Sequence, residues 1–173
     1  WALFFKTLGQ IDENKVTRFV LNYSKTQDVR AEAVRSILDS AQYIPEIIER
    51  ISRPAEGISW KRYRKIFLTN ERITKGVNFW NDHESTLNAV SKDTGVEIEY
   101  LIAILGVETY YGEKKGAYKV LDALYTLAFA YPKRANFFTK ELGEFITLSI
   151  TQNLDLYNAE GSYAGAIGYC QFM

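Results

Sequence analysis

The chain has 173 residues, a length that fits one sizeable domain or two small ones. Its 21 Lys and Arg residues balance 21 Asp and Glu residues, and zero net charge argues against a nucleic-acid-binding protein, which normally carries a basic surplus. The single cysteine, Cys170, excludes an internal disulfide, and with one His it also argues against a structural zinc site. No apolar run reaches the roughly 18 residues that a transmembrane helix needs.

Three short helices are predicted in the first third of the chain, where strand-like alternation is scarce. Apolar spacing predicts the first over 16–23, Asp28 is expected to cap the second, and Pro45 opens the third. Pro54 and Gly57 are expected to end the third helix. The residues expected on the inner faces of this small helical subdomain are Val16, Phe19, Val20, Tyr23, Val34, Ile37, Leu38, Ala41, Ile47, Ile48 and Ile51.

Two further helices follow. Ser59 is expected to cap a helix over 60–67, whose basic residues form a solvated face. Asn70 is expected to cap a longer helix that runs to about Asp93. His83 lies among polar residues of that helix and is interpreted as a surface residue without a catalytic role. The predicted buried stripe of the longer helix is Ile73, Val77, Trp80, Leu87 and Val90.

The stretch 97–112, EIEYLIAILGVETYYG, is predicted to be the central helix of the fold. Its middle is apolar on every side, which is typical of a buried helix, and Glu108 stands at the end of that run. A carboxylate that leaves water is costly unless it is paired, hydrogen-bonded or protonated, and a protonated Glu can donate a proton. The residues alone leave two interpretations open: a general acid in a cleft, or a buried Glu that bridges two helices.

The remainder of the chain also favours helices, so an all-α fold is predicted. Val120–Tyr131 is an apolar helix, and Pro132 begins another. The stretch 161–173, GSYAGAIGYCQFM, is rich in small residues. We expect an N-terminal helical domain over 1–88 and a catalytic core over 89–173.

Six ordered sequence blocks are similar to one enzyme family. RPAE, WKRYRKIF, GVNFWN, GVETYYG, LDALYTLAFAYPKRANFF and GSYAGAIGYCQFM closely resemble the membrane-bound lytic murein transglycosylase B family, from about Phe19 to Met173. The resemblance implies a lysozyme-like core. It also implies cleavage of the β-1,4 bond between N-acetylmuramic acid and N-acetylglucosamine in peptidoglycan, with a 1,6-anhydro-muramoyl end as product. In the family one Glu performs both proton transfers, and the nucleophile belongs to the substrate.

The resemblance assigns roles to single positions. Glu108 corresponds to the catalytic acid of the family. Ser162 corresponds to a Ser that hydrogen-bonds near the catalytic Glu or the reacting sugar, and the alternative is a loop-capping Ser. Gln171 corresponds to a Gln that faces the saccharide, the alternative being a Gln at a helix N-terminus, and Phe172 beside it is also expected to bind substrate.

Three further residues correspond to the family less closely or with an alternative. Tyr63 matches a cleft-lining Tyr, and the alternative is a core Tyr packed on Phe67. Arg134 matches the second Arg of a substrate-binding pair, whereas Lys133 replaces the first and loses its bidentate geometry. Cys170 replaces a common Gly and is interpreted as structural.

The resemblance also implies a setting for the protein. It implies peptidoglycan glycan strands as partners, with cell-wall synthesis or division proteins as further candidates, and a bacterial periplasmic, outer-membrane-associated location. Membrane contact would come only from a lipid anchor outside this sequence, and no nucleic acid is expected as a partner. Catalysis is expected to need no cofactor and no metal, and the calcium loop of the family would lie beyond Met173, since the sequence reads as part of a longer protein. Alternatives are a peptidoglycan-binding module without turnover and a lysozyme-type hydrolase.

Overall fold

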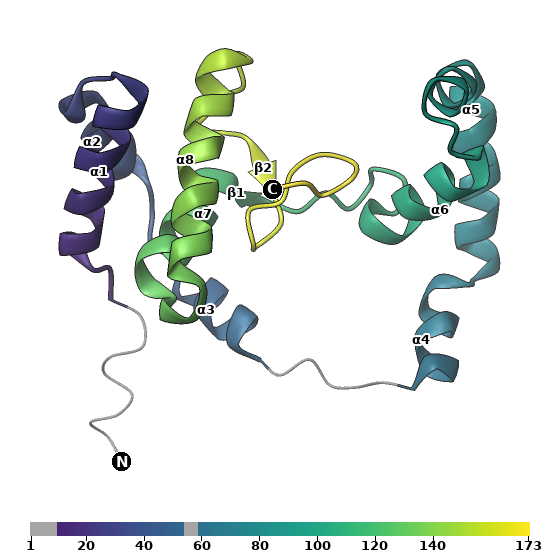
Figure 1. Cartoon of the computed structure of the whole chain (residues 1–173). Coiled ribbons are helices and arrows are strands. Elements are labelled where there is room, and N and C mark those ends of the chain that lie inside the picture. The colour runs from purple at the N-terminus through teal and green to yellow at the C-terminus, as the bar shows by residue number, and fades with distance from the viewer. Residues whose placement is uncertain (1–9, 54–58) are drawn as a thin grey trace. The chain divides into compact units, whose positions relative to one another are not determined.

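The computed structural model describes residues 10–53 and 59–173, and most of them are helical (Figure 1). The all-α prediction is therefore confirmed. The expected helix breakers Pro54 and Gly57 lie outside the described residues. No helix in the described ranges is long and apolar enough to cross a membrane. The helices are α1 (Glu13–Gln27), α2 (Ala31–Ser40), α3 (Pro45–Ser52), α4 (Trp60–Phe67), α5 (Asn70–Thr94), α6 (Ile98–Thr109), α7 (Val120–Ala130) and α8 (Ala135–Thr151), and a 3-10 turn covers Pro132–Arg134.

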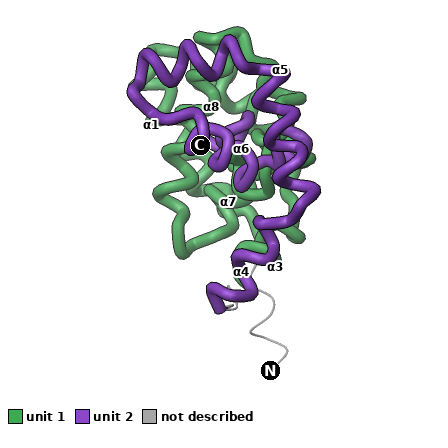
Figure 2. The backbone as a smooth tube through the Cα atoms, turned by 90° about the vertical axis from the view of Figure 1, so that its right-hand side faces the viewer, with its two compact units in different colours: residues 1–53, 116–166, 173 green, residues 54–115, 167–172 purple. Residues whose placement is uncertain are grey.

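The described residues form two compact units, which Figure 2 shows in different colours. Unit 1 contains the described residues up to Arg53, then Gly116–Ala166 and Met173. Unit 2 contains the described residues from Ser59 to Lys115 and the short segment Ile167–Phe172. Each unit is thus assembled from separate stretches of chain, whereas the sequence prediction placed one boundary after residue 88.

Unit 1 is built around α7, in which every residue is buried. An all-round apolar helix needs cover on every side, and α1, α3 and α8 supply it. The predicted inner faces of the first three helices are confirmed at eight of eleven positions, and Ile37, Ala41 and Ile51 are half-buried. Buried residues on these helices and on α8 are Val16, Phe19, Val20, Tyr23, Val34, Leu38, Ile47, Ile48, Phe138, Leu142, Phe145 and Ile146.

Two buried polar side chains of α7 hold the connection between α2 and α3. The Asp122 carboxylate accepts the backbone N–H of Gln42 at 2.8 Å, and the Thr126 hydroxyl accepts that of Ile44 at 3.0 Å. Buried backbone donors need partners, so this connection has a defined position on α7. Unit 1 also contains a small antiparallel sheet, which was not predicted. It pairs β1 (Tyr118–Lys119) with β2 (Glu160–Gly161).

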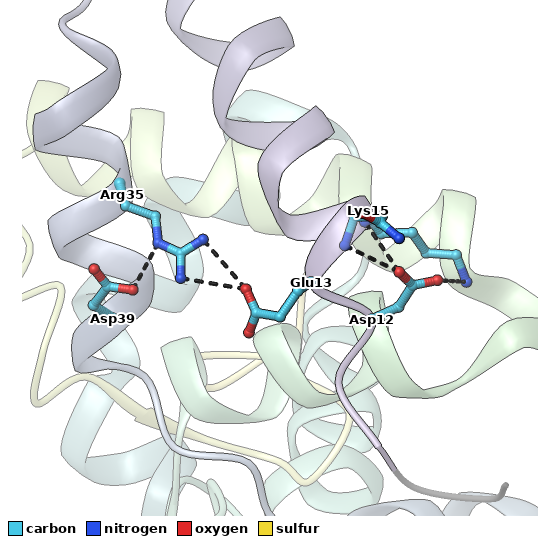
Figure 3. Close-up of polar contacts among 6 residues, drawn as sticks. Asp12, Glu13, Lys15, Arg35 and Asp39 are labelled. Carbon is cyan, nitrogen blue, oxygen red and sulfur yellow. Dashed lines mark hydrogen bonds and ion pairs between the residues drawn. The ribbon is translucent and has the colours of Figure 1, made fainter.

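Polar contacts at the start of α1 explain where this helix begins (Figure 3). Asp12 is the N-cap and accepts the backbone N–H of Lys15 at 3.3 Å. This hydrogen bond lowers the pKa of the Asp12 carboxyl below its usual value, so the cap is present at neutral pH and is lost as the pH falls through that lowered pKa. The Arg35 guanidinium of α2 forms ion pairs with the carboxylates of Asp39 at 2.7 Å and Glu13 at 3.3 Å. These pairs are exposed and add little stability.

Some predicted caps are wrong by one element or one residue. Asp28 does not cap the second helix: it ends α1 in the left-handed conformation, with φ of 52°. Thr69, not Asn70, caps α5, because its hydroxyl accepts the backbone N–H of Arg72. Neighbouring polar residues compete for the cap position, and spacing alone does not separate them.

Unit 2 contains α4, α5 and α6, and it corrects two predictions about burial. Only Leu87 of the predicted α5 stripe is buried. In α6 only Ile102, Gly106 and Thr109 are buried, so the prediction of a helix buried on every side is wrong. An apolar sequence marks a face that favours burial, but the face is buried only where another element covers it. Here the uncovered faces of α5 and α6 line two cavities.

Candidate active site

A cavity with a volume of about 750 Å³ lies along α5, α6 and the segment 167–172 of unit 2. Its wall is mostly apolar, and Glu108 is the one carboxylate among the residues that line it. Large, mostly apolar cavities with few convergent polar groups are typical of ligand sites. The lining residues are Phe79, His83, Thr86, Leu87, Val90, Leu101, Ile104, Leu105, Glu108, Tyr169, Cys170 and Phe172.

Glu108 lies in the last turn of α6, and its side chain is exposed toward the cavity. Within residues 10–53 and 59–173, no donor hydrogen-bonds or ion-pairs with its carboxylate. The interpretation of Glu108 as a buried residue that bridges two helices is therefore wrong. A carboxylate without a structural partner at a cavity wall is available to exchange a proton with a ligand.

His83 also lines this cavity, although sequence reasoning interpreted it only as a surface residue. It is exposed, as predicted, but its backbone leaves helical geometry (φ −121°, ψ 19°) and marks a kink in α5. Its ring lies 4.3 Å from that of Phe79, centroid to centroid. Phe79 and His83 are four residues apart, so the spacing allowed this contact, but no sequence signal indicated the cavity beside them.

The ring of Tyr111 packs against Gly76 of α5 and Gly106 of α6 and so sets the distance between these two helices. A β-carbon at Gly76 or Gly106 would lie 2.6 or 2.7 Å from the Tyr111 hydroxyl oxygen, so only glycine admits this ring. The hydroxyl donates to the Arg72 carbonyl at 3.0 Å, and burial raises the pKa of the phenol, which keeps it a donor. This contact fixes α6, and with it Glu108, against α5.

The loop after α6 is held by charged and aromatic contacts. The Tyr110 hydroxyl donates to Glu71 at 2.7 Å, and this hydrogen bond raises the pKa of the phenol. Lys75 donates to Glu113 at 2.6 Å, which raises the pKa of the ammonium. Neither Glu113 nor Lys75, with which it pairs, lines the cavity. Glu113 is therefore not a second carboxylate of the site.

The segment Ile167–Phe172 forms one wall of the cavity. The Ile167 N–H donates to the Phe172 carbonyl at 2.8 Å and closes the segment into a tight loop. Gln171 has φ of 53°, and its amide nitrogen donates to the carbonyls of Lys115 at 3.1 Å and Gly168 at 3.0 Å. Cys170 is not among the left-handed residues, so cysteine causes no backbone strain at this position.

Gly112 is where the loop after α6 meets that wall, and we expect it to tolerate no side chain. It has φ of 90°, and a β-carbon there would collide with the Tyr169 ring. Gly95 is the control, since its φ is 73° but nothing lies within 4 Å. We expect Gly95→Ala to lower the free energy of unfolding by about 1–2 kcal/mol, and Gly112→Ala by about 2–5 kcal/mol. Urea denaturation of both variants measures this, and equal losses would contradict the collision.

The comparison with known proteins identifies the family of the chain. Residues 12–173 match the family described as the Transglycosylase SLT domain. The chain belongs to this family. It is 38% identical to "Membrane-bound lytic murein transglycosylase B" of Escherichia coli (strain K12) over 152 residues, which cover 82% of this chain and 42% of that protein.

Solved structures of SLT-domain enzymes resemble the fold. The soluble lytic transglycosylase SltB1 from Pseudomonas aeruginosa matches with a TM-score of 0.88 and 43% identity, over 91% of this chain and 54% of that one. The E. coli lytic transglycosylase Slt35 in complex with calcium matches with a TM-score of 0.86 and 35% identity, over 92% and 51%. The lysozyme-like prediction is confirmed, and the chain spans about half the length of these relatives.

Two residues that the family resemblance predicted in the site do not line the Glu108 cavity. Tyr63 of α4 is 42% exposed, packs on Trp60 and Phe67, and is absent from the lining of the Glu108 cavity. The Ser162 hydroxyl, in unit 1, accepts the backbone N–H of Ala166 at 3.1 Å, which is the loop-capping contact. The substrate roles of Tyr63 and Ser162 stay predictions.

The predicted basic pair, Lys133 and Arg134, lies in unit 1. Arg134 and Lys133 are exposed on the 3-10 turn, and the Arg134 guanidinium carbon lies 4.1 Å from the centre of the Phe137 ring. Stacking orients one face of the guanidinium and leaves its N–H edge for an anionic ligand. No group of three or more His, Cys, Asp or Glu residues that could hold a metal occurs in the described part of the chain.

Proposed function

We propose that the chain carries a peptidoglycan lytic transglycosylase activity that forms a 1,6-anhydro-muramoyl end. The observation that supports this most strongly is that Glu108 is the one carboxylate in the lining of a large cavity. Most glycosidases that use water or form a glycosyl-enzyme employ two carboxyl groups about 5–10 Å apart. A single carboxylate suits a reaction in which the substrate supplies its own nucleophile.

In the proposed reaction Glu108 acts first as an acid and then as a base. Its carboxyl proton moves to the glycosidic oxygen as the bond from that oxygen to C1 of the muramic acid breaks. The resulting carboxylate then takes the proton of the C6 hydroxyl of the same sugar as O6 bonds to C1. The proton balance closes, and the tethered hydroxyl has a large effective molarity compared with water.

The remaining sequence-predicted residues would hold the glycan strand. Gln171 and Phe172 belong to the loop that walls the cavity, where Phe172 is 73% exposed and offers a flat apolar face to a sugar ring. Ser162, Tyr63, Arg134 and Lys133 are proposed as further saccharide or peptide contacts. Arg134 would bind a substrate carboxylate more specifically than Lys133, because only a guanidinium can donate two parallel N–H hydrogen bonds to a carboxylate.

Relatives support the setting of this function. The E. coli relative is named membrane-bound, and a structure of SltB3 from P. aeruginosa, 25% identical to this chain, contains NAG-anhNAM-pentapeptide. We propose peptidoglycan glycan strands as the partner and a periplasmic, outer-membrane-associated location. Cell-wall synthesis or division proteins are further proposed partners. Slt35 has been solved with calcium, and no step above uses a metal.

The product tests this proposal. We expect fragments released from purified peptidoglycan to end in 1,6-anhydro-muramic acid, each one water lighter than a hydrolysis product. Mass spectrometry before and after borohydride reduction, with digestion in ¹⁸O-labelled water, decides it. Ends that are reducible or labelled would identify a hydrolase, and binding without release would identify a binding module.

A further inference from the structure

The hydroxyl of Thr109 joins three parts of unit 2. Thr109 directly follows Glu108 in the last turn of α6, and its side chain is fully buried. Its hydroxyl donates to the Tyr169 carbonyl at 2.9 Å and accepts the Gly112 N–H at 3.0 Å. The Leu105 carbonyl is a second acceptor at a longer 3.4 Å. A hydroxyl has one proton to donate, so the shorter contact to Tyr169 is the dominant one.

The partner of that hydrogen bond is the loop that walls the Glu108 cavity. Tyr169 lies between Ile167 and Phe172 and lines the cavity together with Glu108. The residues that this bond connects, Thr109 and Tyr169, are 60 positions apart in the chain. The bond therefore sets how the catalytic helix and this wall lie relative to one another inside unit 2.

We propose that Thr109 is a positioning residue. Its hydroxyl holds the loop 167–172 so that a saccharide bound by this loop lies within proton-transfer distance of Glu108. Thr109 does not touch substrate, since its side chain has no exposed surface. It acts through Tyr169, whose neighbours Gln171 and Phe172 are the proposed saccharide contacts. This role rests on the proposed function, and its structural part can be tested without it.

Other contacts keep the loop attached when the hydroxyl is removed. The Gln171 amide donates to the Lys115 carbonyl at 3.1 Å, and the Lys115 ammonium lies 4.9 Å from the centre of the Tyr169 ring. Thr109→Val retains the shape of the side chain but leaves the Gly112 N–H and the Tyr169 carbonyl without their partner. We therefore expect a displaced loop in a folded protein rather than unfolding.

The chain offers a matched control at the end of α5. The Thr94 hydroxyl donates to the Val90 carbonyl at 2.8 Å and accepts the Val96 N–H at 3.3 Å. It thus makes similar local contacts at a helix C-terminus, but it is exposed and makes no bond to the loop 167–172. Thr94→Val removes a helix-end hydroxyl without removing the connection that we propose.

The first experiment measures the loop directly and needs no activity. Cys170 follows Tyr169 and is the one cysteine of the chain, so thiol labelling with dithiobis-nitrobenzoate reports on this loop alone. Losing one hydrogen bond should raise the labelling rate of Thr109→Val about tenfold. Thr109→Ser and Thr94→Val should label at the wild-type rate. A folded Thr109→Val protein that labels like wild type would overturn the proposal.

The second experiment measures turnover of soluble glycan strands by the same variants. A misplacement of about 1 Å can cost about 10²-fold in rate, so we expect Thr109→Val to lower kcat about 10²-fold, with a smaller change in KM. Thr109→Ser should restore most of kcat, whereas a merely structural role would lower the amount of folded protein and leave kcat per folded molecule unchanged. An inactive wild-type protein would refute the proposed function, and the labelling rates would still decide the role of Thr109.

Discussion

Glu108→Gln is expected to abolish release of soluble fragments from purified peptidoglycan while binding to peptidoglycan persists. Glutamine has the shape of glutamate but cannot donate an acid proton. General acid–base groups contribute about 10²–10⁴-fold, and one group that serves two proton transfers should lie at the upper end of that range. Fragment release, measured with co-sedimentation of protein and peptidoglycan, tests both halves of this prediction.

The control for Glu108→Gln lies on the same helix. Glu99 is exposed in the first turn of α6 and is absent from the lining of the Glu108 cavity, so Glu99→Gln makes the same chemical change away from that site. It should retain most of the wild-type activity. If Glu108→Gln retained a tenth of the wild-type rate, Glu108 would not be the catalytic acid.

Leu142→Ala is expected to give a large loss of stability in unit 1. Leu142 of α8 has no exposed surface in the core around α7, so truncation leaves a cavity that close packing cannot fill. Leu→Ala changes of this kind cost about 2–5 kcal/mol, a large part of the stability of a typical domain, about 5–15 kcal/mol. The free energy of unfolding by urea measures the effect.

Leu148 provides the matched comparison on the same helix, because it is 40% exposed. Leu148→Ala makes the same chemical change at the surface and should cost less than about 1 kcal/mol. Similar losses for both variants would show that the α7–α8 core does not dominate the stability of unit 1.

The sequence predicted helices well, but it predicted burial correctly only where another element covers the apolar face. The spacing of Val16, Phe19, Val20 and Tyr23 predicted the inner face of α1, because local periodicity reports directly on one face of a helix. The same reasoning failed for α6, whose apolar sides are cavity walls. Whether a face is covered depends on residues far away in the sequence, and periodicity contains no information about them.

The candidate site shows the same limit. Glu108, Gln171 and Phe172 could be named because they stand in recognisable blocks. Thr109 and His83 could not, since a hydrogen bond over 60 positions and a kink in a long helix appear only when the chain is folded. The residues that sequence reasoning missed are those whose importance comes from long-range contacts.

The interleaved path of the chain has a consequence for how the protein is made. Unit 2 takes its last segment, Ile167–Phe172, only after Gly116–Ala166 has been added to unit 1. A growing polypeptide folds from its N-terminus at the pace of translation. The cavity at Glu108 therefore stays without one wall until residue 172 has left the ribosome, however early α6 folds. Cleavage between residues 115 and 167 would likewise separate Glu108 from Tyr169 in the covalent chain.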